Sequence, residues 1–366
     1  MKKNIAVSAL ILIIVVMLLF SACSSQDFGN SNSNLPDPTL FRQQDRERYF
    51  IELDDIYYCI LDCMTYFSEK EKLEFYPLCN KPDCKHDNSN CNAYAGAALG
   101  YWKEHLYGAV LLEGEPRIFR MNLDGTEHTK IADLEQPVNP AGTAGGFYRF
   151  YVHNGYMYYE VSNEGMNALF RTELETGKTE RLLTDLLHGE TQFSSTLRFN
   201  EQTFYFVLYD EGIRTLYCVD TTTLEALKVR EWPLENRGWS VYGNIIYYYA
   251  SDRAIFCEYD LTTGEEKTFS QQDYHGGAAN YDDDYIYLTT WDDDEFGNMG
   301  LSIFDRNYQF IQRIDYQPNQ DLLYDAQDKL IFTTLPSQKA TKYLPKSAIG
   351  TGEAELLPIE NPYSYR

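Results

Sequence analysis

A tight turn followed by an aromatic strand recurs along this chain, and this repeat constrains the fold more than any other feature. It is clearest from Tyr151 to Leu183, where a turn at Asn154-Gly155 precedes an aromatic strand at Tyr156–Tyr159 and two further strands follow. Turns rich in Asn, Asp and Gly join antiparallel strands, and aromatic residues favour strands. We therefore predict that the unit is a small antiparallel meander.

Seven copies of this signature follow one another roughly 40–50 residues apart, the spacing expected of propeller blades. They begin at Leu53, Lys103, Asn154, Glu201, Gly243, Asp283 and Gln327. A meander has a face that it cannot bury alone, and packing between two like neighbours buries it. The chain is thus predicted to be all-β, a seven-bladed β-propeller of four-stranded antiparallel sheets in one domain at 45–366. Six blades and a pair of β-sandwiches are the alternatives, and only Thr184 to Gly189 has a weak helical pattern.

The N-terminal residues have the pattern of an export signal. Met1-Lys2-Lys3 precedes an apolar run from Ile5 to Phe20, and Ser21-Ala22-Cys23 follows. A basic start, a short apolar stretch and small residues before a cleavage point are typical of a secretory signal. The run is shorter than the about 20 residues of a membrane-spanning helix. An ordinary signal peptide and an uncleaved anchor remain alternatives to the lipoprotein described next.

The position of Cys23 resembles the lipobox of bacterial lipoproteins, although Phe20 stands where Leu is usual. The resemblance implies that 1–22 is a lipoprotein signal peptide and that Cys23 is lipidated. Residues 23–44 are rich in Ser, Asn, Pro and Gly, a composition that stays flexible, and are predicted to be a tether. The protein is expected on the outer side of the cell membrane. Acyl chains such as palmitate would be its only attachment to the membrane.

An insertion at 76–94 is the one stretch outside the repeat with a sharp signature. Its pattern, Cys-x4-Cys-x-His-x4-Cys, is formed by Cys79, Cys84, His86 and Cys91. Three thiols and an imidazole suit a tetrahedral zinc site, although the spacing is not one of the common zinc-finger spacings. In an exported protein a disulfide competes with this interpretation. The odd thiol would then pair with Cys59 or Cys63 or remain reduced. In each case the segment fixes a loop, and a structural zinc ion is the one cofactor considered.

The segment Pro-Leu-Cys-x-x-Pro-x-Cys-x-His at 77–86, the lipobox and the aromatic repeats together resemble a known family. Its members are uncharacterised propeller lipoproteins of Gram-positive, Clostridia-type gut bacteria, with domains of unknown function. The resemblance covers most of the mature chain, and the cysteine segment is its most specific part. It implies a cell-surface propeller and carries over no catalytic residue.

The chain is strongly acidic, with a formal net charge of −24 over 366 residues. Such a surface repels phosphate backbones, so no nucleic-acid partner is expected. Carboxylates are too numerous for any pair of them to indicate a site. The acidic loop Asp292–Glu295 does not have the spacing of the twelve-residue calcium loop and is interpreted as a solvated loop.

Motifs for chemistry are missing from the sequence. It contains no Gly-x-Ser-x-Gly, His-Glu-x-x-His or phosphate loop, and we predict no catalytic or cofactor-binding residue. His105, His128 and His153 are expected to be solvated near turns. The favoured function is a non-catalytic scaffold that binds a glycan, a peptide or an envelope protein at a propeller mouth. The alternative is an extracytoplasmic glycan-active enzyme, a lyase or hydrolase, on the same scaffold.

Overall fold

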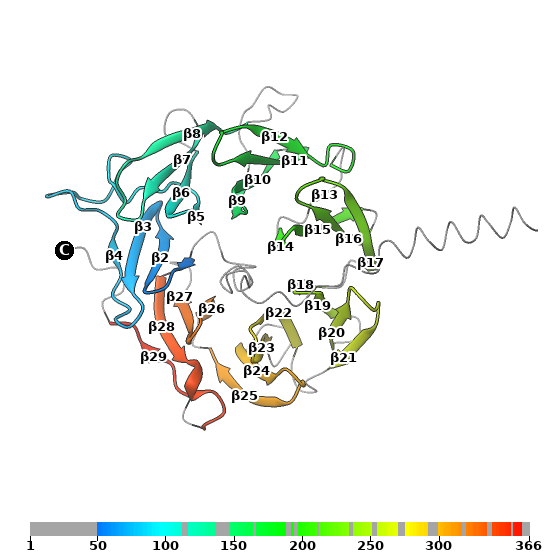
Figure 1. Ribbon diagram of the computed structural model, residues 1–366. Coiled ribbons are helices and arrows are strands. Elements are labelled where there is room, and N and C mark those ends of the chain that lie inside the picture. The colour runs from blue at the N-terminus through cyan, green and yellow to red at the C-terminus, as the bar shows by residue number, and fades with distance from the viewer. Residues whose placement is uncertain are drawn as a thin grey trace, which may run out of the picture. The chain divides into compact units, whose positions relative to one another are not determined.

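Seven antiparallel sheets arranged as the blades of a β-propeller make up the computed structural model (Figure 1). The structure describes residues 50–111, 116–135, 147–163, 166–187, 192–193, 197–210, 212–233, 237–250, 255–269, 275–291, 299–316, 320–334, 339–352 and 354–360. The prediction of seven four-stranded blades is confirmed, and the six-bladed and two-sandwich alternatives are excluded. Cys23, the tether at 23–44 and the acidic loop Asp292–Glu295 lie outside the described residues.

Each blade is built from strands that are consecutive in the chain. Blades 1 to 3 are β1–β4 (Phe50–Glu52, Ile56–Leu61, Met64–Glu69, Tyr76–Pro77), β5–β8 (Leu99–Trp102, His105–Val110, Arg117–Asn122, Thr129–Asp133) and β9–β12 (Phe147–His153, Tyr156–Asn163, Met166–Glu173, Thr179–Leu182). Blade 4 is β13–β17 (Gln192–Phe193, Arg198–Asn200, Thr203–Asp210, Ile213–Asp220, Ala226–Pro233), in which β13 and β14 both pair with β15.

The remaining blades follow the same plan. Blade 5 is β18–β21 (Arg237–Tyr242, Ile245–Ala250, Ile255–Asp260, Glu266–Phe269) and blade 6 is β22–β25 (His275–Tyr281, Tyr285–Trp291, Gly300–Asp305, Phe310–Asp315). Blade 7 is β26–β29 (Gln320–Asp325, Lys329–Thr334, Lys339–Pro345, Leu357–Pro358), with a single 3₁₀ turn, η2, at Lys346–Ala348. Within the described residues, no helix has the length and apolar character needed to cross a bilayer.

The aromatic strands are apolar on both faces because each blade is packed between two others. In β10, Met157, Tyr158 and Tyr159 are all fully buried. Successive side chains of a strand point to opposite faces. Met157 and Tyr159 accordingly pack into a core with residues of blade 2, whereas Tyr158 packs into a core with residues of blade 4. This two-sided burial explains why the repeat reads as a continuous aromatic run instead of alternating with polar residues.

Aspartates close the hairpins between the third and fourth strands of several blades. Oδ1 of Asp220 accepts hydrogen bonds from the backbone N–H groups of Thr222 at 2.7 Å and Thr223 at 2.8 Å. Asp260 receives the same pair from Thr262 and Thr263 at 2.7 and 3.0 Å. These bonds lower the pKa of both carboxyls. The Asp and Thr residues that predicted tight corners therefore act by the expected side-chain-to-backbone bonding.

The ring closes between blades 7 and 1 without a shared sheet, since none of the sheets of the described residues combines strands from the two ends of the chain. Phe50 of β1 stacks on Tyr324 of β26 with ring centroids 4.5 Å apart. The buried carboxylate of Glu52 accepts the N–H of Gln327 at 3.3 and 3.2 Å and pairs with Lys70 at 2.7 Å. The sequence alone did not show how the ring closes.

Two local predictions were wrong. The weak helical pattern at Thr184–Gly189 is a turn over its described part, where Leu187 N–H bonds to the carbonyl of Leu183 at 2.8 Å. His153 is not solvated: its side chain is 5 % exposed, and Nε2 lies 2.8 Å from the Glu201 carbonyl of the next blade. Burial lowers the pKa of His153. Its ring stacks on Phe199, so it packs between two blades as an aromatic side chain.

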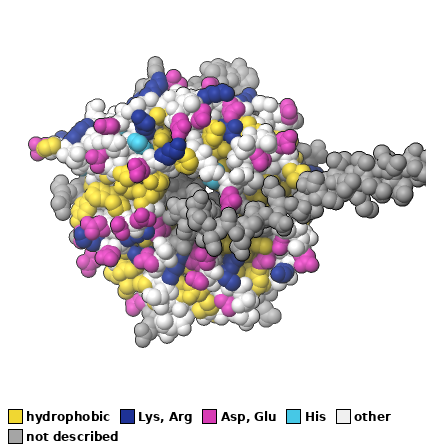
Figure 2. Space-filling view, in the orientation of Figure 1, with side chains coloured by type: hydrophobic (Ala, Val, Ile, Leu, Met, Phe, Trp, Pro, Cys, Tyr) yellow, Lys and Arg dark blue, Asp and Glu magenta, His cyan; other side chains and the backbone are white. Residues whose placement is uncertain are grey.

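The face of the ring seen in Figure 2 carries acidic and basic side chains that are interspersed, with apolar side chains between them. Such mixing is typical of a soluble surface.

Candidate metal centre

The cysteine-rich segment connects β4 of blade 1 to β5 of blade 2, and both of its ends are fixed to one residue of β3. The N–H of Leu78 donates to the carbonyl of Thr65 at 2.9 Å, and the N–H of Thr65 donates to the carbonyl of Ala93 at 2.6 Å. Residues 79–92 therefore form a loop whose two ends lie close together in space, because both are hydrogen-bonded next to Thr65. This closure brings Cys79, at the start of the loop, close to Cys91, at its end.

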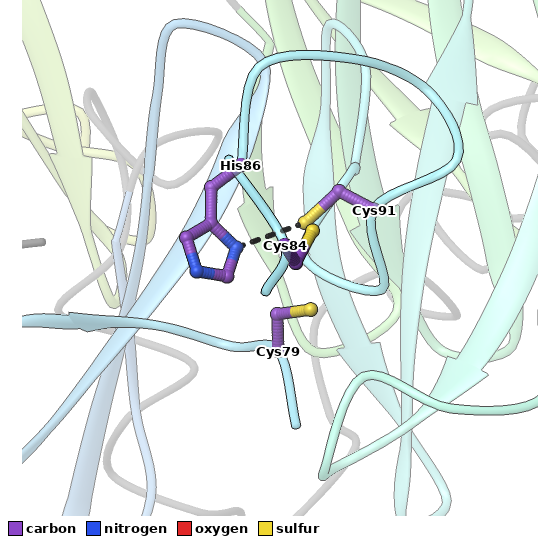
Figure 3. Close-up of side chains that lie close together, drawn as sticks. All are labelled: Cys79, Cys84, His86 and Cys91. Atoms are coloured by element: carbon purple, nitrogen blue, oxygen red, sulfur yellow. Dashed lines mark hydrogen bonds between the residues drawn. The ribbon is translucent and has the colours of Figure 1, made fainter. Parts of the chain in front are cut away.

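The four residues singled out in the sequence converge inside this loop (Figure 3). The sulfur atoms of Cys79, Cys84 and Cys91 and a ring nitrogen of His86 all lie within 4.8 Å of one another. Nδ1 of His86 is 3.3 Å from Sγ of Cys91. The three thiols are not joined in disulfides.

This spacing fits a tetrahedral metal ion. Zinc bonds of about 2.3 Å to sulfur and about 2.0–2.1 Å to nitrogen place tetrahedral ligand atoms about 3.5–3.8 Å apart. A disulfide instead needs sulfur atoms about 2.05 Å apart, and it would engage only two of the three thiols. The four side chains can thus hold one metal ion with only small adjustments.

The backbone supports thiolate ligands at both ends of the loop. Burial opposes ionisation of Cys79, but the N–H groups of Lys81 and Asn92 and the thiols of Cys91 and Cys84 together outweigh burial and lower the pKa of Cys79. The N–H of Ala93 donates to Sγ of Cys91 at 3.3 Å, although burial raises the pKa of Cys91 to about 12. Metal ligands of this kind are deprotonated when an ion binds, and N–H donors to the sulfur orient them.

The middle of the loop has a constrained backbone. Asp83 and His86 have φ angles of +59° and +54°, a left-handed conformation that is uncommon for residues other than glycine. The loop is further held by a bond of 2.9 Å from Asn92 Nδ2 to Asn80 Oδ1. Unusual angles of this kind persist only where surrounding contacts impose them. Here they accompany the turn that directs Cys84 and His86 toward the same point.

The loop also contacts blade 2 at the corner between β7 and β8. Nε2 of His128 lies 3.0 Å from the carbonyl of Asn92, and the Tyr58 O–H of blade 1 donates to the carbonyl of Leu123 at 3.1 Å. Gly125 has a φ of +78°, and a Cβ atom there would lie 2.4 Å from the carbonyl oxygen of Leu78. The segment therefore fills the junction between blades 1 and 2, and only glycine permits this approach.

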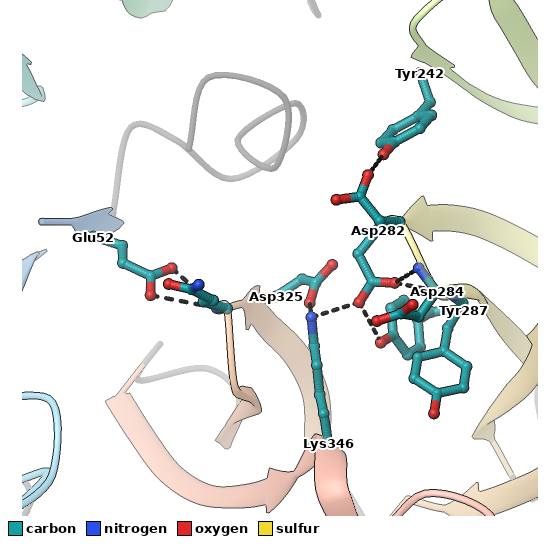
Figure 4. Close-up of polar contacts among 10 residues, drawn as sticks. Glu52, Tyr242, Asp282, Asp284, Tyr287, Asp325 and Lys346 are labelled. Carbon is teal, nitrogen blue, oxygen red and sulfur yellow. Dashed lines mark hydrogen bonds and ion pairs between the residues drawn. The ribbon is translucent and has the colours of Figure 1, made fainter. Parts of the chain in front are cut away.

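A second buried polar cluster joins blades 6 and 7 (Figure 4). Nζ of Lys346, in η2, lies 2.5 Å from Asp282 and 2.6 Å from Asp325. Both carboxylates are buried, and Asp282 also accepts the O–H of Tyr287 at 2.7 Å. Burial opposes ionisation of Asp282, but Lys346, the Tyr287 hydroxyl and the N–H of Tyr285 together outweigh burial and lower the pKa of Asp282.

Sequence reasoning assigned no role to this cluster. Asp282 and Lys346 are 64 positions apart, and neither belongs to a recognisable motif. The only available signal was an aspartate at the end of the first strand of each blade, Asp282 after β22 and Asp325 at the end of β26. In the sequence, such an aspartate cannot be distinguished from a solvated turn residue. Of the other predicted residues, His105 and His128 are at least partly exposed near strand ends, as expected.

The chain matches no protein-family model and no curated protein sequence. Among solved structures it resembles a post-proline cleaving enzyme from Rickettsia typhi, with a TM-score of 0.56, 12 % identity, and coverage of 90 % of this chain and 55 % of the enzyme. A prolyl endopeptidase gives a TM-score of 0.58 at 11 % identity, covering 89 % and 52 %. The computationally designed protein Ika8 gives 0.51 at 11 % identity, covering 86 % and 87 %.

These similarities concern the fold alone, because the identities are so low. The chain spans about half the length of each of the two peptidases. The propeller architecture is thus shared with proteins of different function, and a fold of this kind does not define an activity.

Proposed function

We propose that the protein is a lipid-anchored, extracytoplasmic propeller that acts as a non-catalytic binding scaffold, with a structural zinc ion at Cys79, Cys84, His86 and Cys91. The observation that carries the metal centre is the convergence of four metal-ligand atoms within 4.8 Å of one another at the junction of blades 1 and 2. Four protein ligands complete a tetrahedral shell, which is the arrangement of structural and not of catalytic zinc sites.

When bound, zinc would supply a fixed, four-coordinate link across the loop. The chain's own contribution is the closed loop, in which Thr65 holds both ends and N–H groups point at the sulfur atoms of Cys79 and Cys91. A site of this kind contributes directly to folding free energy. The expected role is to fix the loop that lies at the junction of blades 1 and 2, in addition to the side chains packed there.

Metal analysis of the purified full-length protein tests the metal centre. We expect about one zinc ion per chain and three thiols that become reactive only after a chelator is added. Mass spectrometry after differential alkylation shows which of the cysteines are reactive, protected by the metal or joined in a disulfide. A disulfide between two of Cys79, Cys84 and Cys91, with no bound metal, would overturn the proposal.

The anchor is a separate part of the proposal and rests on the sequence. The apolar run, the small residues before Cys23 and the flexible tether at 23–44 support a lipid-linked N-terminus. Labelling cells with a palmitate analogue should modify the protein, and Cys23→Ser should abolish labelling and release the protein from membranes. Labelling that persists in the variant would refute lipidation at Cys23.

The binding role is tested with glycan and peptide arrays probed with the zinc-loaded protein. Retained ligands without chemical change support the scaffold. Cleavage of an arrayed glycan would instead favour a glycan-active enzyme, and an absence of any ligand would refute the binding role.

A further inference from the structure

A pocket of about 390 Å³ lies between the outer hairpin of blade 1 and the metal-binding loop. The hairpin lines it with Phe67, Glu69, Lys72, Glu74, Tyr76 and Pro77, and the loop lines it with Cys79 and His86. This volume is in the range of small-molecule sites, about 300–1,000 Å³. Two of the four metal ligands thus form one wall of a cavity, which a merely structural centre does not require.

The opposite wall follows from the period of the strands. Phe67 and Tyr76 are cross-strand partners of β3 and β4, and their ring centroids are 6.4 Å apart. Glu69 lies two positions after Phe67, and Glu74 lies two positions before Tyr76. Side chains two apart on a strand share a face. The pairing therefore places the two aromatic rings and the Glu69 carboxylate on the same side of the hairpin, and Glu74, just before β4, lines the same pocket.

The carboxylates of this wall are not equivalent. Glu69 pairs with Lys72 at 2.7 Å, and both side chains are exposed to solvent. Glu74 accepts the O–H of Tyr76 at 2.7 Å, and among the described residues no lysine or arginine forms a salt bridge with it. Lys72 also lines the pocket, but its ammonium is paired with Glu69, so the two carboxylates of this wall outnumber its one ammonium. A carboxylate held beside an aromatic ring attracts a cation.

We propose that this pocket binds an organic cation, a primary ammonium or a guanidinium group, between the Tyr76 ring and the Glu74 carboxylate. The ligand class extends the proposed binding scaffold and rests on that function. Three thiolates around one divalent ion leave the loaded centre with a formal charge of about −1, so the metal wall also favours a cation. The same charges disfavour phosphates and carboxylates.

The cation can come from a lysine or arginine side chain of a peptide or from a free amine, and titration calorimetry of the full-length, zinc-loaded protein separates the two sources. The probes are N-acetyl-lysine amide, N-acetyl-arginine amide and butylammonium, with N-acetyl-norleucine amide as the uncharged control. We expect saturable binding of the cations with Kd of about 1 mM or tighter. Tighter binding of the amino-acid amides identifies a peptide source, and equal binding identifies a free amine.

Glu74→Gln should weaken cation binding at least about fivefold, and Tyr76→Leu at least about threefold. Glu71→Gln is the matched control, because Glu71 is an exposed carboxylate of the same hairpin that does not line the pocket, and its effect should stay below about twofold. Equal losses in the Glu71 and Glu74 variants, binding of norleucine amide as tight as that of lysine amide, or no saturable binding would each overturn the proposal.

The same protein samples are analysed for zinc, so the two proposals fail separately. Cation binding by protein that takes up no zinc would refute the metal centre and leave the pocket. A sample with one zinc ion per chain and no cation binding would refute the pocket and leave the metal centre. Unchanged zinc content in Glu74→Gln and Tyr76→Leu shows that both variants retain the folded loop.

Discussion

Two polar clusters lie at junctions between neighbouring blades in this propeller, and they differ in where the positive charge comes from. Between blades 6 and 7, Lys346 provides an ammonium group that two carboxylates surround. Between blades 1 and 2, three thiols and an imidazole surround a point that no side chain of the described residues occupies with a cation. The first cluster contains its own cation, the ammonium group of Lys346. The second is a set of metal ligands that would need a bound metal ion as its cation.

Metal removal should give the largest effect if this distinction is correct. A chelator, or the variant Cys84→Ser, should lower the melting temperature by roughly 10 °C or more, because binding of structural zinc is coupled to folding. Differential scanning calorimetry with and without zinc measures the shift. Cys218→Ser is the control, since Cys218 is another unbridged cysteine that lies in blade 4. A chelator that leaves the melting temperature unchanged would show that the loop needs no ion.

Removing the internal cation should give the next largest effect. Lys346→Met leaves two buried carboxylates without their shared partner, which costs about 3–5 kcal/mol. Urea unfolding measures this loss, which added zinc should not restore. Lys178→Met, at an exposed position, should change stability by less than about 0.5 kcal/mol. Similar values for the two variants would mean that the ion pairs of Lys346 do not stabilise the fold.

Acidification should weaken the cluster of blades 6 and 7 through Asp282. The folded-state pKa of Asp282 is lowered, so its contribution is complete above the unfolded value of about 3.9 and is lost as the pH falls through the folded value. Asp282→Asn should therefore be less stable than the natural protein at neutral pH, and the difference should shrink below about pH 4. Its loss at neutral pH should be smaller than that of Lys346→Met, because Lys346 keeps Asp325. Urea unfolding at several pH values checks this; a constant difference would contradict it.

The contact between the metal loop and blade 2 should give the smallest effect. Gly125→Ala places a Cβ 2.4 Å from the Leu78 carbonyl oxygen at a φ of +78° and should cost about 1–3 kcal/mol. Gly212→Ala separates the two causes, since Gly212 has a φ of +83° but no neighbouring atom within 4 Å. Chemical denaturation should show a larger loss for Gly125→Ala, together with weaker zinc retention. Equal losses would assign the whole effect to backbone conformation.

The blades were predictable because their signals are local. A turn such as Asn154-Gly155 and a run such as Met157–Tyr159 specify a hairpin within a few residues, and seven repeats specify the architecture. The four metal-ligand residues were also found from spacing. Their closure through Thr65 was not, because it depends on a backbone contact with a different strand. The cluster around Lys346 depends on residues far apart in sequence, and His153 owes its burial to Phe199 and Glu201 of the next blade.

The way the ring closes has a consequence for how the chain tolerates rearrangement. No sheet contains strands from both ends of the described chain, and the junction of Phe50 with Tyr324 and of Glu52 with Gln327 uses only side chains and one turn N–H. Every blade is therefore a self-contained stretch of sequence. A circular permutant opened between β12 and β13, with the old termini joined by a linker, would keep all seven sheets whole. The blade at which the chain begins is thus separable from the order of the blades around the ring.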